Sequence, residues 1–430
     1  MSSSDSVANA PSCLRLALII GKKAAGEGSN FIFSPLSIQL ALALVAEGAR
    51  GETLQQLLSF LGSPDVSHLQ AATLRLLHSI STEESAAEPI VPANIAIRLG
   101  TPFLVGAKDA TDLPSAPPRV SFANSIWFCQ KRLVLNPAYV HAASSLYDSS
   151  VKTVDILNNA DQVSREINSW AEEKTNGLIK YIIPEGNLDL ETTILLANAV
   201  YFKALWGTPF PINYTTKGRF YLLDGSTISV PFLSHRHNFY ISFSHRFKIL
   251  KLPYRQFPGA KTFFSMLIFL PNDSDQLYEI MDEILSTPDF LKEYTPTEAL
   301  RLHRFMLPKF KFSFDCEPSE ALKKLELILP FSKSNADLLG MLKLPHPDLK
   351  PIDNLYMKTM FHKSTIEINE TGTIASCVSL PSLCGGGIFY TRPVLPEFVA
   401  DHPFIFAIVD EKSGTLLFLG HVVNPLEDAC

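Results

Sequence analysis

The sequence lacks the features that would place it among enzymes, metalloproteins or membrane proteins. None of the patterns GxSxG, HExxH and GxGxxG, nor a phosphate-binding P-loop, occurs in its 430 residues. Its six cysteines are scattered without a CxxC pair, which argues against a zinc site and a disulfide scaffold. The apolar run Cys13–Ile20 is far shorter than the roughly 20 residues that span a bilayer. We therefore expect no catalytic residue, metal, cofactor or membrane partner.

Charge and composition restrict the remaining possibilities. Lys and Arg total 37 against 43 Asp and Glu, and no stripe of basic residues suits a nucleic acid. The N-terminus has no basic leader with a small-residue cleavage site, so we expect a cytoplasmic or nuclear protein with reduced thiols. The 46% hydrophobic content is enough for a large core, and no convincing linker divides the chain. The sequence predicts one monomeric domain over residues 1–430.

Helical signals dominate the beginning of the chain and strand signals its second half. Ser34-Pro35 combines an N-cap with a proline at the first helical position, and this helix should stop at Gly48. A second helix should start near Thr53. From Ile194 onward, short apolar runs predict strands, and the last two should form a buried hairpin before residue 423. Helices followed by strands indicate the α+β class.

Residues 82–118 differ from their surroundings because they contain six prolines without sustained periodicity. This composition predicts a surface loop or a disordered insertion. The pair Asp401-His402 lies before Pro403 and a predicted strand, where a structural hydrogen bond is the better interpretation than part of a catalytic triad. His235 and His237 would share one face of a strand, as metal ligands do. Without a third ligand nearby, exposed strand positions fit them better.

Several separate stretches resemble motifs of the serpin family, and they occur in the family's order along nearly the whole chain. The N-terminal half contains NFIFSPLSI from Asn30, EGARGET from Glu47, ANSIW from Ala123 and ANAVYFK from Ala197. The C-terminal half contains IEINETGT from Ile366, FVADHPF from Phe398 and FLGHVVNP from Phe418. The sequences of the last two stretches are most similar to those of plant serpins of the Z type. Family members of that kind are also cytosolic or nuclear.

The resemblance implies a fold of three β-sheets and about nine helices in a metastable state, with an exposed reactive-centre loop over residues 372–396. A target serine or cysteine protease cleaves the loop as bait, and the loop's N-terminal part then inserts into the large sheet and traps the protease. The protein is thus expected to be an inhibitor and not an enzyme. By the same resemblance, Ser34, Ser37, Asn198 and His362 match the polar shutter where the sheet must part. Their alternative interpretation is ordinary helix capping and buried hydrogen bonding.

Insertion requires compact side chains on the face of the new strand that enters the core. The resemblance places the hinge at Glu370 and Gly372, and every second residue counted from Thr373 is small: Thr373, Ala375, Cys377 and Ser379. The intervening set, which includes Ile374, is apolar where the family usually has Glu and alanines. Pro381 would remove a ladder hydrogen bond from a central strand, at a cost of about 1–3 kcal/mol. Insertion could slow or stop at that residue.

Distance along the loop places the reactive bond at Gly386 or Gly387, and in a shifted register Leu383, Cys384 or Tyr390 would serve other proteases. A glycine fills no specificity pocket, so a trypsin-like target is not supported. Two interpretations therefore stay open. The small inward-facing residues favour a protease inhibitor of unknown target. Ile374, Pro381 and the triple glycine favour a non-inhibitory or non-functional serpin.

Overall fold

The computed structural model describes residues 11–80, 118–129, 133–184, 186, 188, 192–257, 259–287, 290–343, 355–373 and 395–427. Nine α-helices lie within this described part, six of them before residue 175. They are α1 (Pro11–Gly26), α2 (Pro35–Ala46), α3 (Gly51–Leu61), α4 (Val66–Ile80), α5 (Pro137–Tyr147), α6 (Ile156–Lys174), α7 (Leu277–Ser286), α8 (Phe290–Tyr294) and α9 (Ser319–Lys324). None of the described helices combines the length and the apolar character needed to cross a membrane.

The helix boundaries follow from local sequence signals. The Ser34 hydroxyl accepts the backbone N–H of Ser37 at 3.2 Å and caps α2, which begins at Pro35. This start is the predicted one, whereas the end of α2 falls at Ala46, two residues before the predicted stop. Helix α3 begins two residues earlier than predicted and ends at Leu61, and the φ of 65° at Gly62 is the left-handed conformation of a C-terminal cap.

The strands form three sheets, as predicted. The seven-stranded sheet has the order β1 (Phe31–Phe33), β17 (Thr415–Val422), β16 (Phe404–Asp410), β9 (Phe264–Pro271), β8 (Phe247–Pro253), β7 (Asn238–Phe243) and β10 (Ala299–Arg301). The four-stranded sheet has the order β15 (Glu397–Val399), β11 (Arg304–Pro308), β6 (Thr227–Leu233) and β5 (Thr216–Tyr221). The six-stranded sheet has the order β12 (Phe310–Cys316), β13 (Met357–Ile368), β14 (Gly372–Thr373), β4 (Ile194–Leu205), β2 (Arg119–Phe128) and β3 (Ser150–Thr153).

The predicted C-terminal hairpin is present as β16 and β17, and both strands are buried on both faces. Alternate residues of β16 enter two different core clusters: Ile405 packs on one side of the sheet and Phe406 on the other. This explains why the hairpin is a continuous apolar run and does not alternate with polar residues. At Gly420 a Cβ would lie 2.4 Å from the carbonyl oxygen of Phe31, so only glycine allows β1 to approach β17 this closely.

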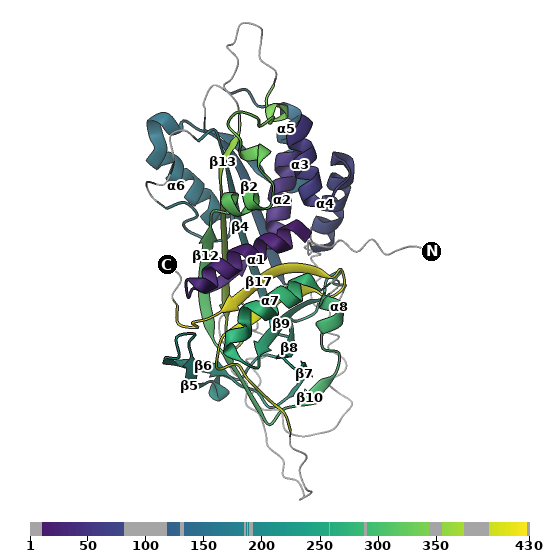
Figure 1. Cartoon of the computed structure of the whole chain (residues 1–430), viewed down its shortest axis with the longest axis vertical. Helices are drawn as coiled ribbons and strands as arrows, with labels where there is room; N and C mark the ends of the chain where they lie inside the picture. The colour runs from purple at the N-terminus through teal and green to yellow at the C-terminus, as the bar shows by residue number, and fades with distance from the viewer. Residues whose placement is uncertain are drawn as a thin grey trace, which may run out of the picture.

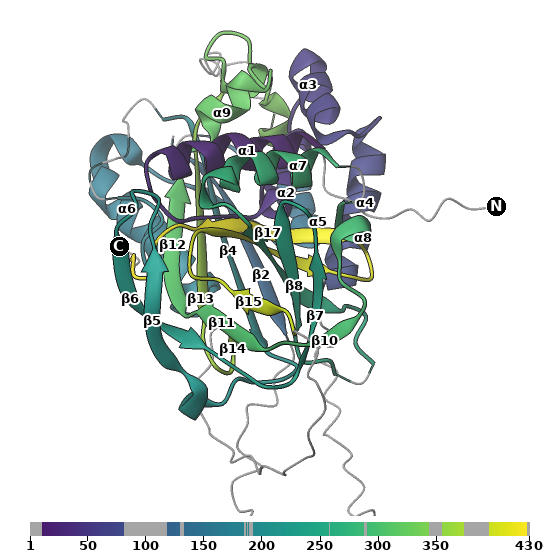
Figure 2. The ribbon, with the colours of Figure 1, turned by 60° about the horizontal axis from the view of Figure 1, so that its bottom comes forward.

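The six-stranded sheet runs along the long axis of the molecule and is covered on both faces (Figures 1 and 2). Helix α6 packs through Ile167 and Trp170 onto one face, against the β4 residues Ala197 and Ala199. Helix α2 lies on the opposite face and contacts β4 through Ser37. Any widening of this sheet therefore occurs between two packed layers.

Candidate functional site

The centre of the six-stranded sheet is a seam between β13 and β4. These two strands run parallel and pair directly over eight residue pairs, from Met357 opposite Ile194 to Thr365 opposite Tyr201. The His362–Asn198 pair lies in the middle of this register. A new strand in the centre of the sheet would have to separate all eight pairs.

A buried polar cluster holds the seam together, and we call it the seam cluster. The amide nitrogen of Asn198 donates to the Ser37 hydroxyl at 2.6 Å and to the side-chain oxygen of Asn124. The side-chain oxygen of Asn198 is hydrogen-bonded to Nδ1 of His362. Nε2 of His362 lies 2.9 Å from the hydroxyl of Ser364. The five side chains come from α2, β2, β4 and β13, so one network connects a helix with three strands.

The partners of His362 define its protonation state. The Asn198 oxygen can only accept, so Nδ1 of His362 carries the proton and Nε2 accepts from the Ser364 hydroxyl. His362 is fully buried, and this burial lowers the pKa of its imidazole to about 3. The ring also packs against Phe33, with centroids 4.8 Å apart. The imidazole is therefore neutral at physiological pH, and both of its nitrogens are hydrogen-bonded.

The structure brings together three of the four predicted shutter residues, Ser37, Asn198 and His362, in direct hydrogen-bonded contact through Asn198. Ser34 is buried beside them and acts through its cap of α2. Sequence reasoning missed Asn124 and Ser364. Ser364 follows His362 by two residues and thus shares its strand face, which is a signal that period-two counting would have found.

The predicted hinge forms the short strand β14, which lies between β4 and β13 at one end of the seam. Gly372 pairs with Leu205, and Thr373 pairs with Ala204 on one side and with Ile368 on the other. A Cβ on Gly372 would lie 2.1 Å from the carbonyl oxygen of Ala204, so only glycine fits here. The described hinge residues are thus already seated as the beginning of a central strand.

Side chains around β14 fix its approach to the sheet. Thr373 is fully buried, and its hydroxyl lies 2.8 Å from the hydroxyl of Tyr254, which agrees with the inward orientation predicted for it. Glu370 binds the Lys309 ammonium at 2.9 Å and accepts from Thr215 at 2.9 Å. Burial raises the pKa of Glu370, but these hydrogen bonds outweigh it and hold the pKa below its usual value. The residues before the loop are therefore firmly anchored.

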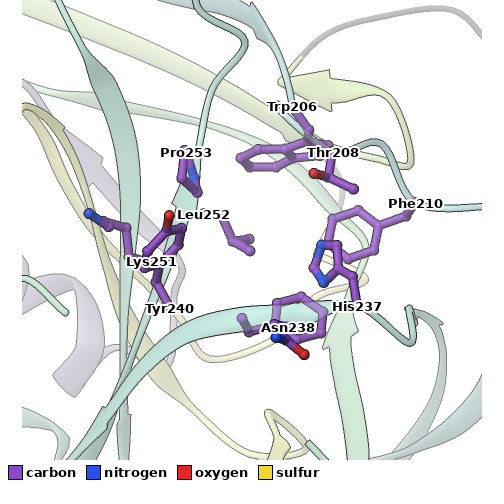
Figure 3. Close-up of a pocket in the computed structure, with 11 residues that line it drawn as sticks. Trp206, Thr208, Phe210, His237, Asn238, Tyr240, Lys251, Leu252 and Pro253 are labelled. Atoms are coloured by element: carbon purple, nitrogen blue, oxygen red, sulfur yellow. The ribbon is translucent and has the colours of Figure 1, made fainter. Parts of the chain in front are cut away.

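A small hollow of about 90 Å³ lies beside this anchor (Figure 3). Trp206 and Phe210 form part of its wall, and their backbone N–H groups donate to the carbonyls of Thr371 and Glu370. His237 lines the same hollow, and burial lowers the pKa of its imidazole to about 4.

The predictions for the remaining histidines have different outcomes. His235 and His237 are only partly exposed and lie in the connection between β6 and β7, so their prediction as exposed strand positions is wrong. Among the described residues no group of three His, Cys, Asp or Glu side chains is arranged to hold a metal ion. His402 lies 2.9 Å from both Asp401 and the carbonyl of Pro271, which is the predicted structural hydrogen bonding.

The other predicted site residues lie outside the part of the chain that the structure describes. They are the inward-facing hinge positions Ala375, Cys377 and Ser379 and the reactive-bond candidates Gly386 and Gly387. The insertion predicted over residues 82–118 also lies outside, apart from Pro118.

Comparison with known proteins identifies the family. The family described as "Serpin (serine protease inhibitor)" matches residues 11–425, which is nearly the whole chain. The chain belongs to the serpin family. This serpin is 39% identical to Serpin-ZXA of Oryza sativa subsp. japonica over 96% of its own length and 95% of that protein. It is 38% identical to Serpin-Z2B of Triticum aestivum, with 96% and 94% coverage.

A solved structure agrees with this assignment. The native stressed conformation of the Arabidopsis serpin AtSerpin1 superimposes with a TM-score of 0.79 at 31% identity, over 99% of this serpin and 100% of that chain. The matching family is one of serine protease inhibitors, and plant serpins are among the relatives. In this serpin β13 and β4 pair directly beyond the end of β14, so no strand separates them in the centre of the six-stranded sheet.

Proposed function

We propose that this serpin inhibits a serine or cysteine endopeptidase by inserting the cleaved loop as a new strand between β13 and β4. The protease nucleophile attacks the scissile carbonyl near Gly386, the amine of the next residue leaves with a proton, and an acyl-enzyme forms. Insertion then competes with hydrolysis of this acyl-enzyme by water. We infer one serpin domain over residues 1–430, with the reactive-centre loop at 372–396 and a loop insertion at 82–118.

The register of β14 is the observation that carries this proposal. Thr373 pairs with Ala204 and Ile368, so an antiparallel strand continued in this register has a defined partner on each side for every residue. Every second residue then follows Thr373 into the core between α2 and the sheet. In this chain those residues are Ala375, Cys377 and Ser379, which are all small. The continued strand is therefore compatible with a closely packed interior.

Continued in this register, Ser379 falls opposite Asn198 on one side and opposite His362 on the other. These are the two residues whose hydrogen bond holds the seam. A serine hydroxyl both donates and accepts, so Ser379 can accept from Nδ1 of His362 and donate to the side-chain oxygen of Asn198. The buried polar groups separated by insertion thereby regain partners. This exchange avoids the cost of about 1–3 kcal/mol for each unsatisfied group.

The opposite face of the inserted strand explains part of the unusual apolar sequence. In the same register Val378 falls opposite Ala199, and Leu380 falls between Ala197 and Phe361. All three partners belong to the apolar cluster beneath α6. Apolar side chains at positions 378 and 380 would therefore pack under this helix and would not face water. Ile374, in contrast, falls opposite the exposed Lys203.

Pro381 sets the expected limit of easy insertion, and it is the main support for the rival, non-inhibitory function. It falls opposite Leu196 and Met360, beyond the seam cluster, and it cannot donate a ladder hydrogen bond. A strand inserted as far as Leu380 has already separated Asn198 from His362. We therefore infer that the switch itself precedes the obstacle.

Incubation with elastase-like, subtilisin-like and papain-like proteases tests the function. An inhibitor yields a covalent adduct that survives boiling in detergent, and its cleaved form melts at a considerably higher temperature than the intact form. Cleavage without adduct and an unchanged melting temperature would establish the non-inhibitory alternative.

A matched pair of variants tests the insertion step. Thr373→Glu places a carboxylate at a fully buried position beside Tyr254, whereas Ile374→Glu places the same charge between the exposed Lys203 and Glu367, which is itself paired with Lys311. We expect Thr373→Glu to be cleaved normally without forming an adduct, because an unpaired carboxylate resists burial. Ile374→Glu should retain adduct formation. Equal behaviour of the two variants would contradict the proposed register.

The thiols support a reducing compartment for this serpin. Cys13, Cys129 and Cys316, the cysteines within the described residues, are all free. We infer a cytoplasmic or nuclear location, which expression of a fluorescent fusion in plant cells would test.

A further inference from the structure

The chain is acidic as a whole, but two of its segments are strongly basic. Residues 203–257 contain eight Lys and Arg with one Asp, and residues 299–311 contain four Lys and Arg with no acidic residue. Because the net charge of the chain is −6, the remaining residues carry a large acidic excess. The positive charge is therefore concentrated in β4 to β8, β10 and β11.

Most of these cations are not neutralised. Four form ion pairs: Arg246, Lys251, Lys309 and Lys311. Seven others are exposed and have no carboxylate within ion-pair distance among the described residues. We call them the loop-end cations, and they are Lys203, Lys217, Arg219, Arg236, Arg255, Arg301 and Arg304.

The loop-end cations surround both ends of the reactive-centre loop. Where the loop leaves the sheet, Thr373 pairs with Ala204, whose neighbour is Lys203. Arg255 is held beside them because its backbone N–H donates to the carbonyl of Leu205 at 2.7 Å. The segment before the loop and the strands that carry these cations lie at the same end of the molecule (Figure 2).

The other end of the loop is equally basic. Strand β15, where the loop returns, pairs with β11 and places Glu397 opposite Arg304. Arg301 pairs with Asn238, two residues beyond Arg236. Lys217 and Arg219 lie on β5, at one edge of the four-stranded sheet that also contains β11 and β15 (Figure 1). Three exposed carboxylates accompany them and are outnumbered: Asp224, Glu298 and Glu397.

We propose that the loop-end cations form a docking surface for an acidic face of the target protease; this rests on the protease-inhibitor function proposed above. A protease bound at Gly386 is tethered by 13 residues to Thr373 and by 11 residues to Glu397, each residue spanning at most about 3.6 Å, so its surface is held within reach of both loop ends. Opposite charge there accelerates encounter by about 10- to 1,000-fold at low ionic strength. The position of the cations around the loop, and not along a separate groove, favours a protease over a nucleic acid as partner.

The test uses a loop that two known proteases can cleave. In a Gly386→Arg background, the loop offers the same bond to anionic and to cationic trypsin, which share their specificity and differ in net charge. The measured quantity is the second-order rate constant of loop cleavage or adduct formation between 20 mM and 500 mM salt. We expect the anionic form to react about tenfold or more faster at low salt, and high salt to remove this advantage.

Charge reversal identifies the surface. The triple substitution R236E/R301E/R304E should lower the rate with anionic trypsin at least tenfold and raise it with cationic trypsin. The matched control R165E/K180E/K343E makes the same charge change at exposed residues outside the basic segments 203–257 and 299–311 and should leave both rates within about twofold. Comparable rates for the two triple variants would overturn the proposal.

The outcomes separate this proposal from the proposed function. Loop cleavage is counted whether or not an adduct forms, so a non-inhibitory serpin still reports on docking. The same triple variant is also tested for binding to a duplex DNA probe. If R236E/R301E/R304E loses DNA binding while its trypsin rates are unchanged, the surface binds nucleic acid, and protease docking is refuted.

Discussion

Lowering the pH from 7.0 to 4.5 is expected to destabilise the native protein through His362. The imidazole is fully buried in the seam cluster, and its pKa falls from 6.5 to about 3 because burial disfavours the charged form. In the unfolded chain the same group titrates near 6.5. Below that pH the unfolded state binds more protons than the native state, so stability falls as the pH falls.

The magnitude follows from the two pKa values. Between pH 7.0 and pH 4.5 one such group lowers the free energy of unfolding by roughly 2.5 kcal/mol, since each pH unit well inside the window costs about 1.4 kcal/mol. His237 and His421, whose pKa values are lowered to about 4 by burial, add to the total loss. A comparison of variants at the two pH values isolates the contribution of His362.

The assay is urea unfolding at both pH values for the unsubstituted protein, His362→Gln and His245→Gln. Glutamine has an amide donor and acceptor but does not titrate, so His362→Gln should lose about 2.5 kcal/mol less stability on acidification. His245→Gln makes the same substitution at an exposed position and is the control for the introduced glutamine. If His362→Gln loses as much stability as the unsubstituted protein, the buried neutral imidazole is not the cause.

Three further predictions concern the hinge and the thiols. Gly372→Val puts a side chain against the carbonyl of Ala204, so amide hydrogens of β14 should exchange at least about tenfold faster in hydrogen-exchange mass spectrometry. Lys309→Met leaves the nearly buried Glu370 unpaired and should cost about 1–3 kcal/mol in urea unfolding, with Lys309→Arg as the conservative control. A thiol reagent at pH 8 should leave Cys13 and Cys129 unlabelled until the protein unfolds, since both are buried and burial raises their pKa values to about 12; labelling of either in the native protein would contradict this.

Local signals in the sequence predicted α2, α3 and the C-terminal hairpin to within a few residues of their observed bounds. The Ser34-Pro35 cap started α2 at the predicted residue, and the apolar runs before and after the last turn formed the predicted hairpin. Both depend on contacts within a few residues, which composition and spacing report directly. The histidines at 235 and 237 show the limit: their spacing suggested a strand, but the connection between β6 and β7 contains them.

The site required two further kinds of information. The serpin motifs pointed to Ser37, Asn198 and His362 as a group, and the structure brought these three together. The partners Asn124 and Ser364 and the stacking of Phe33 on His362 appeared only in the structure. They come from elements that are distant in sequence and adjacent in space.

The sequence by itself determined the family, the α+β class and the composition of the loop, including its small alternate residues and Pro381. Only the tertiary structure decided what that loop would meet. The pairing of Thr373 with both Ala204 and Ile368 sets the register of β14, and under the proposed insertion this register would bring Ser379 between Asn198 and His362. The physical reason is that strand order in a sheet depends on long-range packing, which no local pattern contains.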